Sequence, residues 1–307
     1  MIVVNNTSGE YPDVINSYYD IEKFSEESNS VLFLGYATSR CGETRSKYLN
    51  YKNRIYLNLE SPCSFCSTSS FEEESRYFTH TYTICPYTAD WISSRTSIVA
   101  NAIPFPYNED CFSSIPKDMK ILTSMYMGTI MCKEHEDMVR VIKKRSHSIC
   151  SLHLHPLVTN HNISSHQKWM ILGSSKSSVI MNMCPVTEQH KSWIVKNDLS
   201  SHVAFNNLDY NFMPQFKPRV VESMACKSLC LVKKDPWNVI ENWFKPNEHF
   251  LYWETLDELD LLIENIDKNF ENYSDIINSA FEEVKKYEIK KIFNTIQGDM
   301  SDKFLEK

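Results

Sequence analysis

The sequence is poor in glycine. It contains 6 glycines in 307 residues, at Gly9, Gly35, Gly42, Gly128, Gly173 and Gly298. No two of them have the spacing of G-x-G-x-x-G or of G-x-x-x-x-G-K-[ST], so the sequence excludes both the dinucleotide-binding fingerprint and the Walker phosphate loop. A phosphate-bearing ligand would have to be held by another device.

Positive charge is also scarce. The chain has 32 Lys and Arg against 39 Asp and Glu, a net charge of -7 with neutral histidines. This balance argues against a nucleic-acid partner bound through bulk positive charge. Hydrophobic residues make up 42% and charged residues 23%, which is the composition of a folded globular chain rather than a disordered one.

Long apolar runs are missing. Apolar runs such as residues 31–34 and 229–232 have the length of strands, far below the ~20 residues of a membrane helix. The first residues lack the basic and apolar regions of a secretion signal. We therefore expect no transmembrane segment and a cytoplasmic location, in which the 10 cysteines stay reduced.

Short apolar stretches alternate with helical patterns along the chain. The expected strands are residues 30–36, 54–60, 79–85, 98–103, 120–127, 148–154, 178–183 and 228–232. The expected helices include residues 87–95, 134–144, 165–172 and 218–226, and a further helix opens at Thr255, which forms a capping box with Glu258. This alternation predicts parallel sheets covered by helices, an α/β fold.

A proline-rich stretch divides the pattern in two. Residues 104–119 contain Pro104, Pro106 and Pro116 and are the best linker candidate. We therefore expect two α/β domains, residues 1–115 and 116–307.

The segment with the clearest chemistry is residues 215–232. Pro218 fits the first turn of a helix, and Lys217 and Arg219 flank that helix start. Free N–H groups and the positive end of the helix dipole suit a diphosphate there. Glu222, one turn further on, could accept hydrogen bonds from both hydroxyls of a ribose. The alternative is an ordinary capped helix with a solvated, charged end.

Residues 217–226, Lys-Pro-Arg-Val-Val-Glu-Ser-Met-Ala-Cys, are followed by a short turn and an apolar strand. This block resembles the C-terminal donor-binding motif of GT-B glycosyltransferases, as in their spore-protein-like, exostosin-like and family-1-type members. Residues 169–182 are similar to the family's segment of helix, Ser-Lys and apolar strand. Residues 248–259 are similar to its strand followed by an acid-Leu helix. The resemblance covers roughly residues 165–290.

The resemblance implies two Rossmann-like domains with parallel sheets facing across a cleft. The first domain would bind the acceptor and the second the nucleotide-sugar, with the last helix free to cross back to the first domain. Glu222 would bind the ribose, and Lys217 and Arg219 would face the diphosphate. The donor-binding residues carried over by position are Ser175, Lys176, Lys217, Arg219, Glu222 and Ser223, with Ser175 and Lys176 on the phosphate side of the cleft.

The sequence departs from the family pattern at two positions. Lys227 stands where the family usually has glycine after the helix, and Pro214 stands where retaining members often carry an acid. The second departure favours an inverting transfer, which needs a general base from the first domain. Glu60, directly after an expected strand, is the first candidate and Asp90 the second. The alternative for both is a solvated loop carboxylate.

The metal signals are weak. Cys63 and Cys66 form a lone C-x-x-C, and His153 and His155 would supply only two ligands from one strand face. No D-x-D motif follows an expected strand. We therefore expect no metal and no cofactor, with the nucleotide-sugar bound as substrate.

The resulting expectation is a metal-independent glycosyltransferase. It would move a sugar from a nucleoside-diphosphate donor, UDP-sugar first and GDP-sugar next, to a hydroxyl of an oligosaccharide or glycoprotein glycan. The sequence is similar in style to small transferases of large DNA viruses, phages and bacterial surface-glycan clusters. A nucleotide-sugar epimerase of related architecture and a non-catalytic binding protein with the same fold remain the alternatives.

Overall fold

The computed structural model describes residues 2–5, 30–35, 49–58, 77–95, 99–196 and 211–302. The chain divides into two compact units. Unit 1 comprises Met1–Phe105, Met183–Phe216 and Lys290–Lys307, and unit 2 comprises Pro106–Asn182 and Lys217–Ile289. The sequence-based boundary lies at residues 115 and 116, and it assigns residues 183–216 to the second domain. In the structure those residues group with unit 1, as does the end of the chain.

Unit 1 is built on a five-stranded parallel sheet with the strand order β1-β2-β3-β4-β5. The strands are β1 (Ile2–Asn5), β2 (Ser30–Gly35), β3 (Asn53–Asn58), β4 (His80–Thr83) and β5 (Ala100–Ala102). Ile55, Leu57 and Tyr82 are at most 1% exposed, because strands of a parallel sheet are buried on both faces. Four of these five strands were predicted from the sequence, and β1 was not.

Three helices and one small sheet complete the described part of unit 1. The helices are α5 (Pro86–Arg95), α9 (Glu188–Lys196) and α13 (Ile289–Asp302), whose first residue belongs to unit 2. The small sheet pairs β10 (Met183–Pro185) with β11 (Phe212–Pro214) in antiparallel register. α5 packs against β4 and β5, the two strands between which it lies in sequence.

Unit 2 contains a six-stranded parallel sheet with the order β13-β12-β9-β6-β7-β8. Its strands are β6 (Leu122–Met127), β7 (His147–Ser151), β8 (Asn160–His161), β9 (Ser175–Ile180), β12 (Leu229–Lys233) and β13 (Leu251–Trp253). We call the edge at which these strands end the carboxyl edge, and the edge at which they begin the amino edge.

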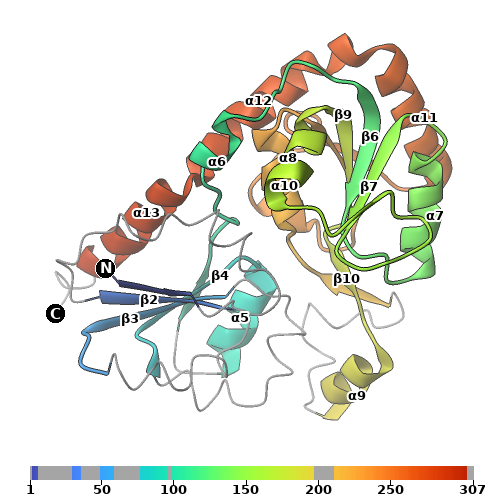
Figure 1. The fold of residues 1–307 in the computed structure, drawn as a ribbon. Coiled ribbons are helices and arrows are strands. Elements are labelled where there is room, and N and C mark those ends of the chain that lie inside the picture. The colour runs from blue at the N-terminus through green and yellow to red at the C-terminus, as the bar shows by residue number, and fades with distance from the viewer. Residues whose placement is uncertain are drawn as a thin grey trace. The chain divides into compact units, whose positions relative to one another are not determined.

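Helices cover both faces of this sheet (Figure 1). α7 (Lys133–Ile142) and α11 (Leu256–Lys268) pack against each other and against β6. α8 (Ser165–Gly173), α10 (Pro218–Ala225) and α12 (Ser274–Val284) form the other group, in which α10 contacts both α8 and α12. The predicted parallel α/β architecture is confirmed. The described residues also include a short helix, α6 (Asp110–Ser113), inside the predicted linker.

Two capping boxes fix helix starts in unit 2. The hydroxyl of Thr255 accepts a hydrogen bond from the backbone N–H of Glu258, whose side chain accepts from the N–H of Thr255, as the sequence predicted. Ser164 and Gln167 make the same reciprocal pair at the start of α8. Each box satisfies two N–H groups that have no partner within the helix. The box before α8 thereby sets which residues of that helix lie near the carboxyl edge.

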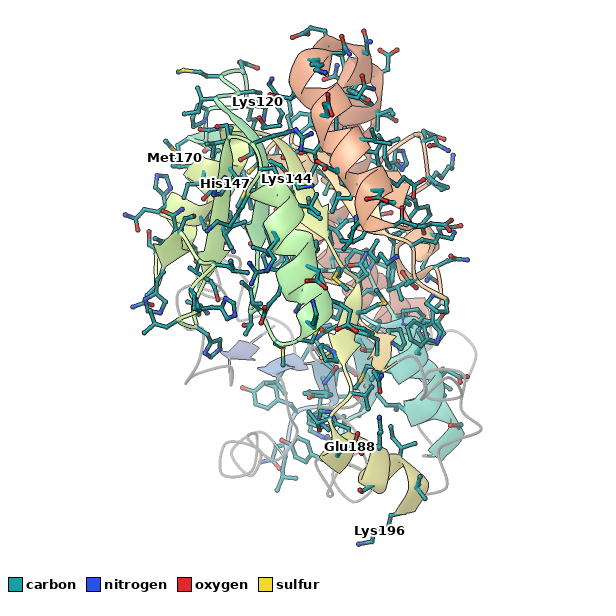
Figure 2. The ribbon with its side chains drawn as sticks, turned by 90° about the vertical axis from the view of Figure 1, so that its right-hand side faces the viewer. Lys120, Lys144, His147, Met170, Glu188 and Lys196 are labelled. Carbon is teal, nitrogen blue, oxygen red and sulfur yellow. The ribbon has the colours of Figure 1, made fainter. Side chains whose placement is uncertain are left out.

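Lys120 holds the other ends of α8 and α10 together. Its Nζ donates to the carbonyl oxygens of Gly173, at 2.7 Å, and of Cys226, at 3.1 Å. Burial lowers the pKa of Lys120 to about 8. Figure 2 shows Lys120 near the end of unit 2 where His147 begins β7, which is the amino edge of the sheet.

Candidate ligand-binding site

The direction of chain progress reverses between β6 and β9. From β6 the chain proceeds through β7 to β8 on one side of the sheet, and it then returns to β9, β12 and β13 on the other side. In open parallel sheets, ligands bind outside the carboxyl ends of the strands at such a reversal point. The residues that follow β6 and β9 therefore mark the candidate site.

Gly128 follows β6 and makes room for Arg219. Its φ is +147°, and a β-carbon at this position would lie 2.4 Å from Nη1 and 2.8 Å from Cζ of Arg219. The guanidinium also lies over the ring of Tyr126, with Cζ 5.6 Å from the ring centroid. Arg219 comes from the first turn of α10, so this packing fixes a cation at the end of β6.

The start of α10 is fixed from the end of β9. The side-chain oxygen of Asn182, which is fully buried, accepts a hydrogen bond at 3.1 Å from the backbone N–H of Lys217. Lys217 is the N-cap residue and Pro218 opens the helix, as predicted from the sequence. The positive end of the α10 dipole and the guanidinium of Arg219 thus lie together at the carboxyl edge.

The pKa of His135 is lowered in part by the positive charge at the carboxyl edge. Burial lowers its pKa to about 4, and the charges of Arg219 and Lys217 contribute to the decrease. Its Nδ1 accepts a hydrogen bond from the backbone N–H of Met131 at 3.3 Å, in the loop after β6. His135 is therefore neutral at pH 7, and the site carries the charge of the two basic residues.

Glu222 lies one turn beyond Arg219 and is 3% exposed. Its Oε1 accepts hydrogen bonds from Nζ of Lys168, at 2.6 Å, and from Nε1 of Trp169, at 3.0 Å. Both donors belong to the second turn of α8. Lys168 and Trp169 were not predicted from the sequence. The signal that could have found them is the capping-box spacing of Ser164 and Gln167, which marks the start of α8 and so places Lys168 and Trp169 close to the carboxyl edge.

The fold matches solved structures of glycosyltransferases over most of the chain. HepE of Anabaena, solved in complex with UDP, is 10% identical, with a TM-score of 0.60 over 88% of this chain and 78% of that chain. A glycosyltransferase from Rickettsia africae is 12% identical, with a TM-score of 0.55 over 89% and 76%. Sucrose-phosphate synthase of Thermosynechococcus elongatus is 11% identical, with a TM-score of 0.54 over 90% and 74%.

The chain has the GT-B fold. In sequence, residues 189–296 match the family described as glycosyl transferase-like, whereas no curated protein matches the chain. The resemblance to GT-B glycosyltransferases noted from the sequence is thereby confirmed.

The GT-B motif of this chain keeps its turn without glycine. After α10, Lys227 adopts a left-handed conformation with φ +53°. The N–H of Ser228 donates to the carbonyl of Ser223, and the N–H of Lys227 donates to the carbonyl of Met224. This pair of bonds is the Schellman motif, whose left-handed residue is usually glycine. Lys227, in place of the family's usual glycine, therefore still ends α10 in a Schellman turn.

Three predicted donor-binding residues do not join Lys217, Arg219 and Glu222 at the carboxyl edge. β9 starts at Ser175, three residues before the predicted strand. Ser175 and Lys176 are therefore the first residues of β9 and lie at the amino edge. Lys176 pairs with Asp267 at 3.1 Å, and the hydroxyl of Ser175 donates to the carbonyl of Ile171. The hydroxyl of Ser223 donates to the carbonyl of Arg219 within α10.

The two catalytic candidates lie in unit 1. Glu60 falls outside the described residues. Asp90 is an exposed residue in the second turn of α5, the helix that follows β4. Their roles as general bases stay predictions.

Of the two weak metal signals, only the histidine pair lies within the described residues. β7 ends at Ser151, so His153 and His155 lie in the following loop, where Nε2 of His155 is 3.6 Å from Oε1 of Glu136. Cys63 and Cys66 fall outside the described residues. Within the described ranges, no group of three or more His, Cys, Asp or Glu residues is arranged to hold a metal ion.

Two further findings concern the described part of the chain. Its cysteines are free thiols, at Cys85, Cys111, Cys132, Cys150, Cys184, Cys226 and Cys230. None of its helices has both the length and the apolar composition that crossing a bilayer requires.

Proposed function

We propose that this chain is a glycosyltransferase that moves a sugar from a nucleoside-diphosphate donor to a hydroxyl group of a glycan acceptor. The observation that carries the proposal is the position of Arg219 at the first turn of α10, against Gly128 at the reversal point of the sheet. The GT-B fold supports it, and the similar HepE was solved with UDP. We propose a UDP-sugar as the first candidate donor and a GDP-sugar as the next.

Lys217, Arg219 and the N-terminus of α10 form what we call the basic cluster. Its proposed role follows from the chemistry of the transfer. The bond between the anomeric carbon and the β-phosphate oxygen breaks, and negative charge grows on the departing diphosphate. The sugar acquires oxocarbenium character at the same time. We propose that Arg219 and the N-terminus of α10 stabilise this departing charge. In this proposal they take the part that a divalent metal plays in other sugar transferases.

The acceptor hydroxyl needs a base as it attacks the anomeric carbon. We propose that a carboxylate of unit 1 takes this proton, with Glu60 as the first candidate and Asp90 as the second. Pro214 stands where retaining relatives often carry an acid, which supports inversion. Glu60→Gln should then keep donor affinity and lose most turnover, whereas normal turnover would move the role to Asp90.

Thermal unfolding with nucleotides tests the donor site. The protein is heated with UDP, GDP, ADP, CMP or TDP, each with and without EDTA. A ligand at about 100 times its dissociation constant stabilises the native state by about 2.7 kcal/mol, a clear rise in Tm. We expect one diphosphate to raise Tm whether or not EDTA is present. If none of the five changes Tm, the proposed donor site is wrong.

Two arginine variants connect this result to the site. Arg219→Met should abolish the rise in Tm, because it removes the cation at the end of β6. Arg140→Met is the matched control, since Arg140 is a surface residue of α7 paired with Glu136 at 3.6 Å. Product analysis then distinguishes the chemistry, because an epimerase would convert the nucleotide-sugar without any acceptor.

A further inference from the structure

Lys168 and Trp169 bind the same oxygen of Glu222 from a different helix. Nζ of Lys168 lies 2.6 Å and Nε1 of Trp169 lies 3.0 Å from Oε1. The two donors are consecutive residues of α8, whereas the carboxylate belongs to α10. Nζ of Lys168 also lies 5.7 Å from the centroid of the Trp169 ring. Glu222 therefore has its charge balanced and its rotamer restricted by one short segment.

The segment that carries these donors is itself immobilised. Trp169 is 2% exposed, and its ring centroid lies 4.6 Å from that of Phe112. Its carbonyl oxygen accepts a hydrogen bond from the thiol of Cys226, at the end of α10, over 3.8 Å. Lys120 joins the same two helices at their carboxyl ends. α8 and α10 are thus held in one register around Glu222.

Stability alone is a poor reason for this arrangement. The Glu222 side chain is 3% exposed and that of Lys168 is 20% exposed, so both charges lose most of their hydration. The desolvation of a buried ion pair offsets much of its attraction, and well-packed apolar residues usually stabilise a fold at least as well. The pair also lies one turn beyond Arg219, on the helix that opens at the carboxyl edge. A carboxylate kept ionised and oriented at that place is suited to binding hydroxyl groups.

We infer that Lys168 and Trp169 are positioning residues for Glu222, the carboxylate that the family resemblance assigns to the ribose of the nucleotide donor. The inference rests on the proposed function, because it assumes a nucleotide at the carboxyl edge. Lys168 keeps the carboxylate charged and Trp169 fixes its direction. The ribose hydroxyls donate hydrogen bonds to it, and neither Lys168 nor Trp169 contacts the ribose.

The test compares UDP with 2′-deoxy-UDP by isothermal titration calorimetry. The wild-type protein should bind UDP at least about tenfold more tightly, because the deoxy compound lacks one hydroxyl donor to a charged acceptor. Lys168→Met should weaken UDP binding by about 10- to 100-fold and bring the ratio of the two affinities towards one. Trp169→Phe, which keeps the packing and removes the N–H, should change both quantities in the same direction.

Three further variants separate positioning from folding. Lys168→Arg should restore the preference for UDP, because it returns the charge. Adding Lys168→Met to Glu222→Gln should cause little further loss, since residues that act through one another are not additive. Lys144→Met is the matched control, because Lys144 is also ion-paired, with Asp260 at 2.5 Å, and it lies just after the end of α7, where Figure 2 labels it. Circular dichroism confirms that each variant is folded.

The outcomes separate the inference from the proposed function. If the wild-type protein binds UDP and both Lys168→Met and Trp169→Phe keep its affinity and its preference within twofold, the inference is wrong and the donor site stands. Equal wild-type affinity for UDP and 2′-deoxy-UDP would also overturn the inference alone. If neither UDP nor any other nucleoside diphosphate binds, the proposed function fails and the inference fails with it.

Discussion

The guanidinium of Arg219 occupies the space that a side chain on residue 128 would need. A β-carbon on Gly128 would lie 2.4 Å from Nη1, 2.6 Å from Nη2 and 2.8 Å from Cζ of Arg219. The backbone of Gly128 also has φ +147°, which residues with a side chain rarely adopt. One glycine thus places a cation of α10 against the end of β6.

Gly128→Ala should therefore displace Arg219 and strain the backbone at the same time. We expect a loss of about 1–3 kcal/mol in the free energy of unfolding and a weaker rise of Tm with UDP. Urea denaturation and calorimetry with UDP measure the two effects.

Gly298→Ala is the control, because a β-carbon there meets nothing within 4 Å in the middle of α13. That change should raise stability by up to about 1 kcal/mol. Wild-type stability and affinity in Gly128→Ala would show that Arg219 does not depend on Gly128.

The left-handed residue after α10 gives a second prediction. Lys227 has φ +53°, and its Nζ lies 4.9 Å from the centroid of the Phe281 ring. Lys227→Gly and Lys227→Ala both remove that contact, so their comparison isolates the backbone. Lys227→Gly should be more stable than Lys227→Ala by about 1 kcal/mol, because glycine adopts positive φ without a steric cost. Equal urea midpoints for the two variants would contradict the assignment of the Schellman turn.

Asp235 makes the stability of the protein depend on pH. It is 2% exposed, and its Oδ1 accepts from the N–H groups of Trp237 and Val239, at 2.9 and 3.3 Å. Its Oδ2 is buried with no hydrogen-bond partner within the described part of the chain. Burial raises the pKa of Asp235 to about 6. The folded state thus binds a proton more tightly than the unfolded state, and this contribution to stability is lost as pH rises from about 4 to about 6.

Asp235→Asn removes this dependence and keeps an oxygen for the two N–H groups. Relative to wild type, the variant should gain about 2 kcal/mol in the free energy of unfolding between pH 4.5 and pH 7.5. Urea denaturation at the two pH values measures the difference. A constant difference between variant and wild type would mean that Asp235 has an ordinary pKa.

Local chemistry in the sequence predicted much of unit 2. The capping box of Thr255 and Glu258 and the helix start at Pro218 are confirmed, because each depends on residues within one turn. Ser175 and Lys176 precede the predicted strand, which begins at residue 178, and the family resemblance placed them on the phosphate side of the cleft. In β9, Ser175 and Ser177 are instead fully buried and donate to backbone carbonyls of Ile171 and Thr123. Such serines have no apolar pattern by which a strand is recognised.

The contacts that complete the candidate site are not local. Lys168 and Glu222 are 54 residues apart, and Gly128 and Arg219 meet only through the fold. Both pairs arise because β6, β9 and the helices α8 and α10 meet at one reversal point of the sheet. No spacing in the sequence encodes them. The sequence could place Arg219 and Glu222 on one helix, but only the structure identifies their partners.

His135 provides a measurement of where a bound diphosphate lies. Its pKa is about 4, lowered first by burial and then by the charges of Arg219 and Lys217. A diphosphate bound to those two residues brings negative charge that offsets theirs. UDP should therefore raise the pKa of His135 towards its ordinary value of about 6.5. Uridine, which has no phosphate, should leave this pKa unchanged.

The titration is followed by NMR of the histidine ring protons, with His135 assigned from the spectrum of His135→Asn. Arg219→Met should raise the pKa of His135 without any ligand, because it removes one of the two cations. The ring-proton chemical shifts of His147, at the amino edge where β7 begins, are an internal control and should not change when UDP is added. If UDP raises Tm while the titration of His135 stays the same, the diphosphate binds away from the N-terminus of α10. Lys217 and Arg219 would then contribute to the stability of the fold and would not bind the donor.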